Sequence, residues 1–261
     1  MTYLAACMTY RDEAPYLREW IEFHRLVGVE RFFLYDSGST DEHAEVLAQY
    51  IARGLVTVEE WHGEGRQNDA IDHCLRVNAD VRWIAFLDAD EFLFNARGRP
   101  VPEVLRAFED CPGVGVNLSA FGTSGHRTRP SGLVIENYLH RTTNPGVTWV
   151  KNIVQPARTT RCRGAHVFEF ESGHGVDVAK RPLEDDRSRS YSQSVLRINH
   201  YVTKSLQEAR AKWAKTRADT GELREPLDVE LLQRLEERFT RDEEILRYLP
   251  HLKRRLGLVS A

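Results

Sequence analysis

Three carboxylates follow an apolar run of strand length in the segment WIAFLDADEFLF, residues 83–94. Residues 83–87 are continuously apolar, which predicts a strand that is buried on both faces of a sheet. In open α/β sheets ligands bind at the carboxyl ends of the strands, and Asp88, Asp90 and Glu91 stand at that end. Carboxylate oxygens suit magnesium, manganese or calcium better than zinc. The segment therefore predicts a divalent-cation site at the edge of a sheet.

An acidic turn that caps the next segment is the alternative interpretation of Asp88 and Asp90, and for an isolated D-x-D pair it is the better one. Here the apolar run resumes at residues 92–94, so the acids lie between two hydrophobic segments. Placing three carboxylates there is costly unless a cation neutralises them. We therefore favour the cation site.

Short strands alternate with amphipathic helices in the first half of the chain. We predict strands at 3–9, 31–36 and 55–61 and, beyond residue 133, at 147–156, 165–170 and 195–201. Helical patterns between the early strands predict βαβ units, and hence an α/β fold whose central sheet is mostly parallel and flanked by helices.

The composition excludes some classes of protein. A formal net charge of −3 over 261 residues gives no electrostatic case for nucleic acid as a partner. No apolar segment reaches about 18 residues, so we expect no membrane span. For the basic, amphipathic tail at 252–257 we favour a solvated helix end, with weak contact with an anionic membrane surface as the alternative. The four cysteines form no C-x-x-C pair, so we expect reduced thiols in a cytoplasmic protein.

Three polar segments are candidates for ligand contact. Gln67 begins a helix whose N-terminus faces the ligand edge of a parallel unit. Residues 122–132, GTSGHRTRPSG, have the composition of a substrate loop, which an ordinary surface loop shares. Residues 171–194 contain few large apolar residues, so we expect either a lid that closes over the ligand or an idle surface insertion.

The order of the motifs resembles that of glycosyltransferase family 92 and its bacterial relatives in the larger family-2-like group. The resemblance covers roughly residues 3–215. Its motifs are the acidic segment together with TYRDEAPY at 9–16, YDSGSTD at 35–41, RQNDAIDHCL at 66–75 and INHYVTKS at 198–205. Apart from the resemblance, a leucine pattern at 231–249 predicts one continuing helix and hence a C-terminal helical extension at 216–261. The resemblance implies a GT-A domain at 1–215, on which this extension packs. It also implies a metal-dependent hexosyltransferase that uses manganese or magnesium and a nucleotide-sugar donor, with UDP as the expected nucleotide and a glycan or lipid-linked acceptor.

The resemblance also assigns side chains to the site. Arg11, Glu13 and Asp36 match positions that line the base and ribose in GT-A enzymes, although helix capping is the alternative role for Asp36. A histidine from the C-terminal half usually joins the metal ligands. The candidates are His166 and His200, and we favour His166 because its spacing from the acidic segment is closer to that of GT-A enzymes.

Phosphate binding and proton transfer need further residues. Lys151 and Lys204 are candidates to neutralise the donor phosphates, and a surface lysine is the alternative for either. An inverting transfer needs a base for the acceptor hydroxyl, and Glu91 and Glu136 are the candidates. Glu91 is near enough to the metal motif to become a metal ligand itself, so we favour Glu136, which follows the expected substrate loop.

Two other classes of protein use similar features. A sugar-phosphate nucleotidyltransferase binds metal on paired aspartates, but it normally opens with a glycine-rich, basic loop after its first strand, and TYRDEAPY contains no glycine. A non-catalytic nucleotide-binding or sugar-binding module would need no metal carboxylates. The acidic segment therefore favours the transferase.

Overall fold

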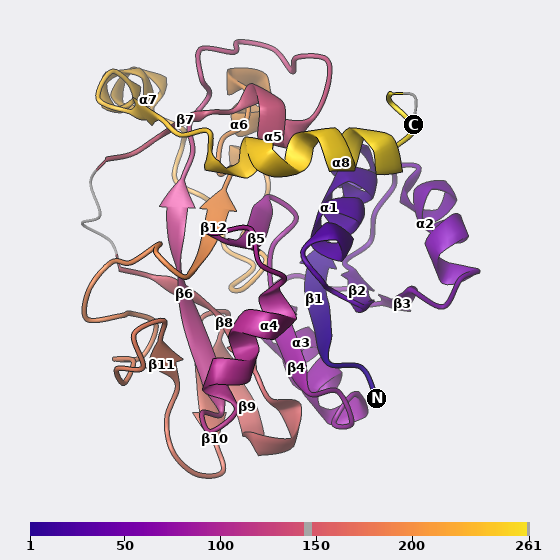
Figure 1. Ribbon diagram of the computed structural model, residues 1–261. Coiled ribbons are helices and arrows are strands. Elements are labelled where there is room, and N and C mark those ends of the chain that lie inside the picture. The colour runs from indigo at the N-terminus through magenta and orange to yellow at the C-terminus, as the bar shows by residue number, and fades with distance from the viewer. Residues whose placement is uncertain (144–147, 260–261) are drawn as a thin grey trace.

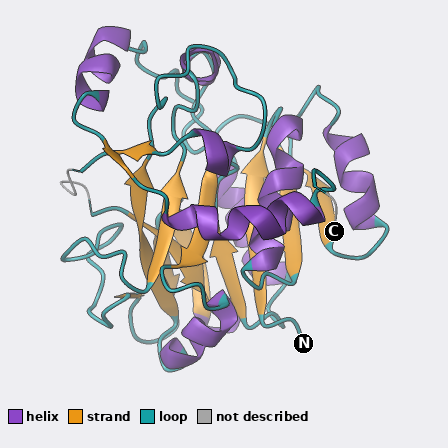
Figure 2. Ribbon diagram, turned by 45° about the horizontal axis from the view of Figure 1, so that its top comes forward, coloured by secondary structure: helices purple, strands orange, loops and turns teal. Residues whose placement is uncertain are grey.

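The computed structural model describes residues 1–143 and 148–259, and one sheet runs through its middle. In spatial order the main strands are β3 (Val56–Glu60), β2 (Arg31–Asp36), β1 (Leu4–Tyr10), β4 (Trp83–Phe86), β8 (Val150–Val154), β6 (Gly113–Ala120), β12 (Leu196–His200) and β5 (Glu91–Asn95). Figure 2 shows these strands side by side, with helices in front of them. Val147, the first residue of the strand predicted at 147–156, lies outside the described residues.

Six of these strands run in one direction, and β8 and β5 run against them. The carboxyl ends of β1, β2, β3, β4, β6 and β12 therefore meet at one edge of the sheet, together with the first residues of β5 and β8. The mostly parallel α/β sheet is confirmed. The two antiparallel strands are an addition that the early βαβ pattern did not predict.

Apolar clusters cover both faces of the sheet. Along β1, Ala6 and Met8 belong to one cluster and Ala5 and Cys7 to the other, because successive side chains of a strand point to opposite faces. Helix α1 (Ala14–Leu26) belongs to the first cluster and α3 (Gln67–Val77) to the second. This two-sided cover explains why the central strands are continuously apolar.

Shorter elements complete the chain. They are α2 (His43–Ile51), α4 (Val101–Leu105), η1 (Arg106–Phe108), α5 (Val134–Asn137), β7 (His140–Arg141), η2 (Pro156–Arg158), β9 (Thr159–Gly164), β10 (Val167–Phe170), β11 (Val176–Asp177) and α6 (Leu206–Trp213). Helix α6 has a capping box: Ser205 accepts from the backbone N–H of Glu208, whose carboxylate accepts from the backbone N–H of Ser205. This box starts α6 directly after the strand that carries His200.

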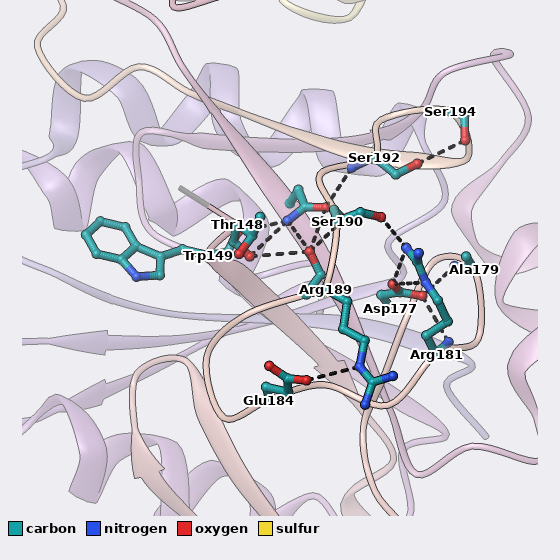
Figure 3. A network of polar contacts seen from close by, with 12 residues as sticks. Thr148, Trp149, Asp177, Ala179, Arg181, Glu184, Arg189, Ser190, Ser192 and Ser194 are labelled. Atoms are coloured by element: carbon teal, nitrogen blue, oxygen red, sulfur yellow. Dashed lines mark hydrogen bonds and ion pairs between the residues drawn. The ribbon is translucent and has the colours of Figure 1, made fainter. Parts of the chain in front are cut away.

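The segment 171–194 is fastened to the body of the protein, which favours the surface insertion over the lid. Strand β11 pairs with β6 at Val114 and Gly115, at the end of that strand remote from the carboxyl edge. The carboxylate of Asp177 accepts from the N–H of Ala179 at 2.8 Å and from Nε of Arg181 at 2.8 Å, and Figure 3 shows both contacts. Hydrogen bonds between polar groups thus hold this segment in place, because it has too few apolar residues to form a hydrophobic core of its own.

The same network joins 171–194 to β6. The side-chain amide of Asn117 donates to Oγ of Ser188 at 2.9 Å, and its oxygen accepts from the N–H of Ser192 at 3.0 Å. Arg181 also donates to Ser190 (Figure 3). The segment is therefore part of the folded body.

The C-terminal region is broken into several pieces, although the leucine pattern predicted one continuing helix. They are α7 (Val229–Glu236), β13 (Thr240–Arg241), η3 (Glu244–Tyr248) and α8 (Leu249–Arg255). In Figure 1, α8 lies beside α1 while α7 stands apart. Asp242 ties the region to the sheet, because its carboxylate accepts from Arg197 of β12 at 2.9 Å and from Arg141 of β7 at 2.6 Å.

Packing on α1 explains the amphipathic pattern of the tail without a membrane contact. Leu252 and Leu256 are buried. Lys253 pairs with Glu136, and Arg255 lies 3.4 Å from Glu22. The apolar face is inside the protein and these two cations are already paired. No helix in the described part of the chain is long and apolar enough to cross a bilayer.

Candidate active site

A cavity of about 350 Å³ opens at the carboxyl edge of the sheet. Its walls come from the ends of β1, β4 and β12, the start of β8, and the residues in and after the last turn of α6. Eight of the sequence-predicted residues line it: Arg11, Glu13, Gln67, Asp88, Asp90, Lys151, His166 and His200. The topology therefore brings together side chains that are far apart in the sequence.

Asp90 lies at the centre of the polar contacts in this cavity. Its Oδ1 is 3.5 Å from Nε2 of His200, and its Oδ2 accepts from Nζ of Lys212 at 2.5 Å. Asp90 is only 6% exposed. Burial alone would raise the pKa of this carboxyl, but Lys212 and His200 lower the pKa well below its usual value. Asp90 is therefore an ionised carboxylate in a largely desolvated setting.

Asp88 has a lysine partner of its own. Its Oδ2 is 2.8 Å from Nζ of Lys151, and its Oδ1 accepts from Nε2 of Gln67 at 3.3 Å. Lys151 is 3% exposed, and although burial lowers the pKa of its ammonium group, Asp88 and Glu91 raise it above the usual range. Lys151 is thus a charged, buried residue beside the acidic segment and is not a surface lysine.

Glu91 lies behind the cavity and does not line it. Its side chain is fully buried, its Oε2 accepts from the backbone N–H of Asp88 at 2.9 Å, and the same oxygen is 3.4 Å from Nζ of Lys151. Burial raises the pKa of Glu91 to about 7. These contacts give Glu91 the role of orienting the turn that presents Asp88 and Asp90, and they place it out of reach of an acceptor in the cavity.

The two candidate histidines have different surroundings. His166 lies in the turn between β9 and β10, and its Nδ1 is 2.7 Å from the carbonyl oxygen of Val150. Burial, followed by Lys151, lowers the pKa of His166. His200 ends β12 and faces Asp90, as described above. The geometry therefore favours His200 as the partner of the acidic segment, contrary to our preference for His166.

The donor set of this cavity fits a divalent cation. Two carboxylates and an imidazole that face one cavity are ligands suited to manganese or magnesium. Among the described residues, no three His, Cys, Asp or Glu side chains are already grouped as a metal centre. Such ions often take only one or two carboxylates from the protein and complete their shell with water and substrate phosphate. Asp90, His200 and Asp88 are the residues that would hold the ion.

The residues assigned to the nucleoside fall into two groups. Arg11 and Glu13 line the cavity, whereas Asp36 does not. Asp36 accepts from the N–H of Ser39 at 2.9 Å and from its hydroxyl at 2.6 Å, so it orders the turn after β2. Lys204 is also outside the lining, with its ammonium group 3.9 Å from the ring centroid of Tyr16. Asp36 thus orders the turn before α2 and does not cap that helix, whose N-cap is Glu42.

Glu136 and the expected substrate loop lie elsewhere. Glu136 accepts from the backbone N–H of Leu133 at 2.9 Å, pairs with Lys253, and is absent from the cavity lining. Residues 123–127 line a second cavity of about 530 Å³, between this loop and α7. The structure therefore does not bring Glu136 to the acidic segment, and our preferred base is not supported.

The sequence analysis did not predict the part of the cavity wall that is formed by the last turn of α6 and the residues after it. Lys212, Trp213, Lys215, Arg217 and Arg224 line the cavity, together with smaller residues between them. The predicted domain boundary between 215 and 216 runs through this wall. One signal was available: α6 begins six residues after His200, so a basic helix had to start near the ligand edge.

The fold and the site define an α/β protein with a polar cavity at the carboxyl edge of its sheet, the edge at which such folds bind ligands. The sequence profile of glycosyltransferase family 92 matches residues 2–241, so the chain belongs to this family, as the order of its motifs predicted.

Several plant proteins are similar to this chain. A family 92 protein of Oryza sativa subsp. japonica is 31% identical over 203 residues, which cover 76% of this chain and 33% of the relative. An Arabidopsis thaliana family 92 protein is 29% identical over 80% of this chain and 37% of its own length. The chain thus matches about a third of the length of these relatives. The galactan β-1,4-galactosyltransferase GALS2 of Arabidopsis thaliana is 32% identical over 36% of this chain and 20% of its own length.

Solved structures show a partial likeness. TarS of S. aureus in complex with UDP-GlcNAc gives a TM-score of 0.42 at 10% identity, over 60% of this chain and 46% of that chain. GalNAc-T7 with UDP, GalNAc and Mn²⁺ gives a TM-score of 0.34 at 15% identity, over 46% of this chain and 23% of that chain.

Proposed function

We propose that this protein transfers a hexosyl group from a UDP-sugar to a hydroxyl group of a glycan, with a divalent cation, on a GT-A domain. The observation that carries the proposal is the meeting of Asp88, Asp90, His200 and two lysines in one cavity at the carboxyl edge of the sheet. Family membership supports sugar transfer and weighs against the nucleotidyltransferase and the binding module.

The chemistry of a diphosphate leaving group accounts for these residues. Manganese or magnesium held by Asp90, His200 and Asp88 would supply Lewis-acid stabilisation of the charge that develops on the diphosphate. Lys151 keeps the acidic turn in place by neutralising Asp88 from the buried side. Gln67 fixes the other oxygen of Asp88. Arg11 and Glu13 follow β1 and line the same cavity, and we propose that they contact the nucleoside.

The galactan galactosyltransferase relatives suggest the substrates to test first. They are named for a β-1,4 linkage, and UDP-galactose carries its sugar in the α configuration, so such a product requires inversion. We propose UDP-galactose as the first donor, inversion as the stereochemical outcome, and a β-1,4-galactan oligosaccharide as the first acceptor.

The test is a UDP-release assay with Mn²⁺ and a panel of UDP-hexoses, with and without that acceptor. Asp90→Asn should lower turnover by at least about 100-fold, because it removes the charge that holds the ion. Asp80→Asn is the matched control, since Asp80 is an exposed aspartate in the turn before β4. EDTA should abolish turnover by the parent protein. Unchanged turnover in Asp90→Asn or in EDTA would rule out the metal, and the absence of turnover with every nucleotide-sugar would rule out the transfer.

A further inference from the structure

The two lysines beside the acidic segment are held in different ways. Lys151 projects from β8, is 3% exposed and contacts both Asp88 and Glu91. Lys212 projects from the last turn of α6, and its side chain is 31% exposed. Lys151 is therefore enclosed by the sheet, whereas Lys212 stands at the rim of the cavity.

Lys212 donates a hydrogen bond to a carboxylate oxygen of Asp90 that the proposed cation would need as a ligand. Its Nζ donates to Oδ2 of Asp90 at 2.5 Å and to the carbonyl oxygen of Val202 at 3.1 Å. The other oxygen of Asp90 faces His200. A divalent ion bound to Asp90 and His200 would place two more positive charges within a few ångströms of the ammonium group. Like charges at that distance repel strongly in a setting shielded from water.

The rim offers the displaced ammonium group an alternative position. Lys212 lines the cavity, and so do Arg11, Lys215 and Arg217. A diphosphate that enters with its ion would bring negative charge to this wall. A lysine side chain has four carbons and enough reach to turn from Asp90 towards that charge without movement of α6.

We propose that Lys212 is an exchangeable counterion: it neutralises Asp90 in the empty site, is displaced when the divalent ion binds, and then pairs with the donor diphosphate. This inference rests on the proposed function. It makes Lys212 a competitor of the metal and a partner of the phosphate. One substitution must therefore change the two affinities in opposite directions.

Two binding measurements on the intact protein test this competition. The affinity for Mn²⁺ alone is measured from the electron paramagnetic resonance signal of the free ion. Lys212→Met should bind Mn²⁺ at least about tenfold more tightly than the parent, because a hydrogen bond between charged groups no longer competes. At saturating Mn²⁺ the same variant should bind UDP at least about fivefold more weakly, with uridine affinity unchanged.

Two further variants separate this role from a general loss of charge. Lys215→Met removes a neighbouring cation of the same wall, which lies 3.3 Å from Asp12, and should leave Mn²⁺ affinity within about twofold of the parent. Lys212→Arg keeps the charge and should retain the parent's Mn²⁺ affinity. Circular dichroism confirms that each variant is folded.

The outcomes are distinct. Equal Mn²⁺ affinity in the parent and Lys212→Met overturns the inference and leaves the proposed function standing. The same gain in Lys215→Met shows a general electrostatic effect and also overturns it. Failure of every variant to bind Mn²⁺, even with UDP present, removes the metal from the proposed function and this inference with it.

Discussion

His200 and Asp90 meet at the carboxyl edge of the sheet, with Nε2 of the histidine 3.5 Å from Oδ1 of the aspartate. Strand register produces this contact. β12 pairs with β5 so that His200 lies opposite Glu91, the residue after Asp90. The backbone N–H of Tyr201 also donates to the carbonyl oxygen of Asp90 at 2.8 Å. The site is therefore built on paired strands and their immediate ends, which fixes the two side chains relative to each other.

Glu136→Gln should leave the catalytic rate within about twofold of the parent. The reason is that Glu136 is engaged by the N–H of Leu133 and by Lys253, outside the cavity. Loss of this partly exposed pair should lower the free energy of unfolding by about 1 kcal/mol or less. Steady-state kinetics and urea unfolding measure the two effects. A rate loss of about 100-fold with normal stability would reinstate Glu136 as the base.

Asp177→Ala should destabilise the fold without affecting nucleotide binding. Asp177 is buried and accepts from backbone N–H groups of Ala179 and Arg181, which would lose their partner. The expected loss is about 2–3 kcal/mol in urea unfolding. Glu184→Ala is the control, because its pair with Arg189 is exposed and should contribute less than about 0.5 kcal/mol.

Nucleotide binding gives the second readout for Asp177. UDP affinity with Mn²⁺ should be the same in the parent and in Asp177→Ala at a temperature where both are folded. Trypsin cleavage at Arg187 and Arg189 should also be indifferent to UDP. Protection of these sites by the nucleotide would mean that 171–194 closes over the donor after all.

The stability of the protein should carry a pH dependence from Glu19. This carboxylate accepts from the backbone N–H groups of Val134 and Ile135, and burial raises its pKa to about 7, with a further rise from Glu136 and an opposing effect from Lys204. Between pH 4.5 and 7 the folded state keeps a proton that the unfolded state loses. The contribution of Glu19 is thus fully present below about pH 4.5 and is lost as the pH rises through 7.

Urea unfolding of the parent and of Glu19→Gln between pH 4.5 and 8 measures this contribution. The difference in unfolding free energy, parent minus variant, should fall by about 3 kcal/mol over that range and then level off. Glu19→Gln has no titratable group at this position, so the contributions of all other groups cancel in the difference between parent and variant. A difference that does not change with pH would show that Glu19 ionises normally in the fold.

The sequence was sufficient to predict the first strands of the sheet and the acidic edge, because local patterns determine both. Continuous apolar runs identified β1, β2 and β4, and the carboxylates after β4 identified the ligand edge. Family motifs added Arg11 and His200. These features depend on neighbours in sequence or on the general rule that parallel strands end together.

The features that the sequence analysis missed depend on contacts between residues that are far apart in the sequence. Polar composition at 171–194 does not reveal that Asn117 and Thr148 supply hydrogen-bond partners for Ser188. The approach of Lys212 to Asp90 spans 122 positions. Glu136 looked suitable because it follows a polar loop, but that loop borders α7 and the second cavity. No local pattern contains these pairings.

We propose that the cavity at the carboxyl edge binds a nucleotide with a divalent ion. The most direct test is crystallography of the protein with UDP and Mn²⁺, with anomalous data collected at the manganese edge. We expect one anomalous peak about 2 Å from a carboxylate oxygen of Asp90 and from Nε2 of His200, with the diphosphate beside it and Nζ of Lys212 turned away from Asp90. A peak remote from both residues, or UDP seated in the cavity beside α7, would contradict it.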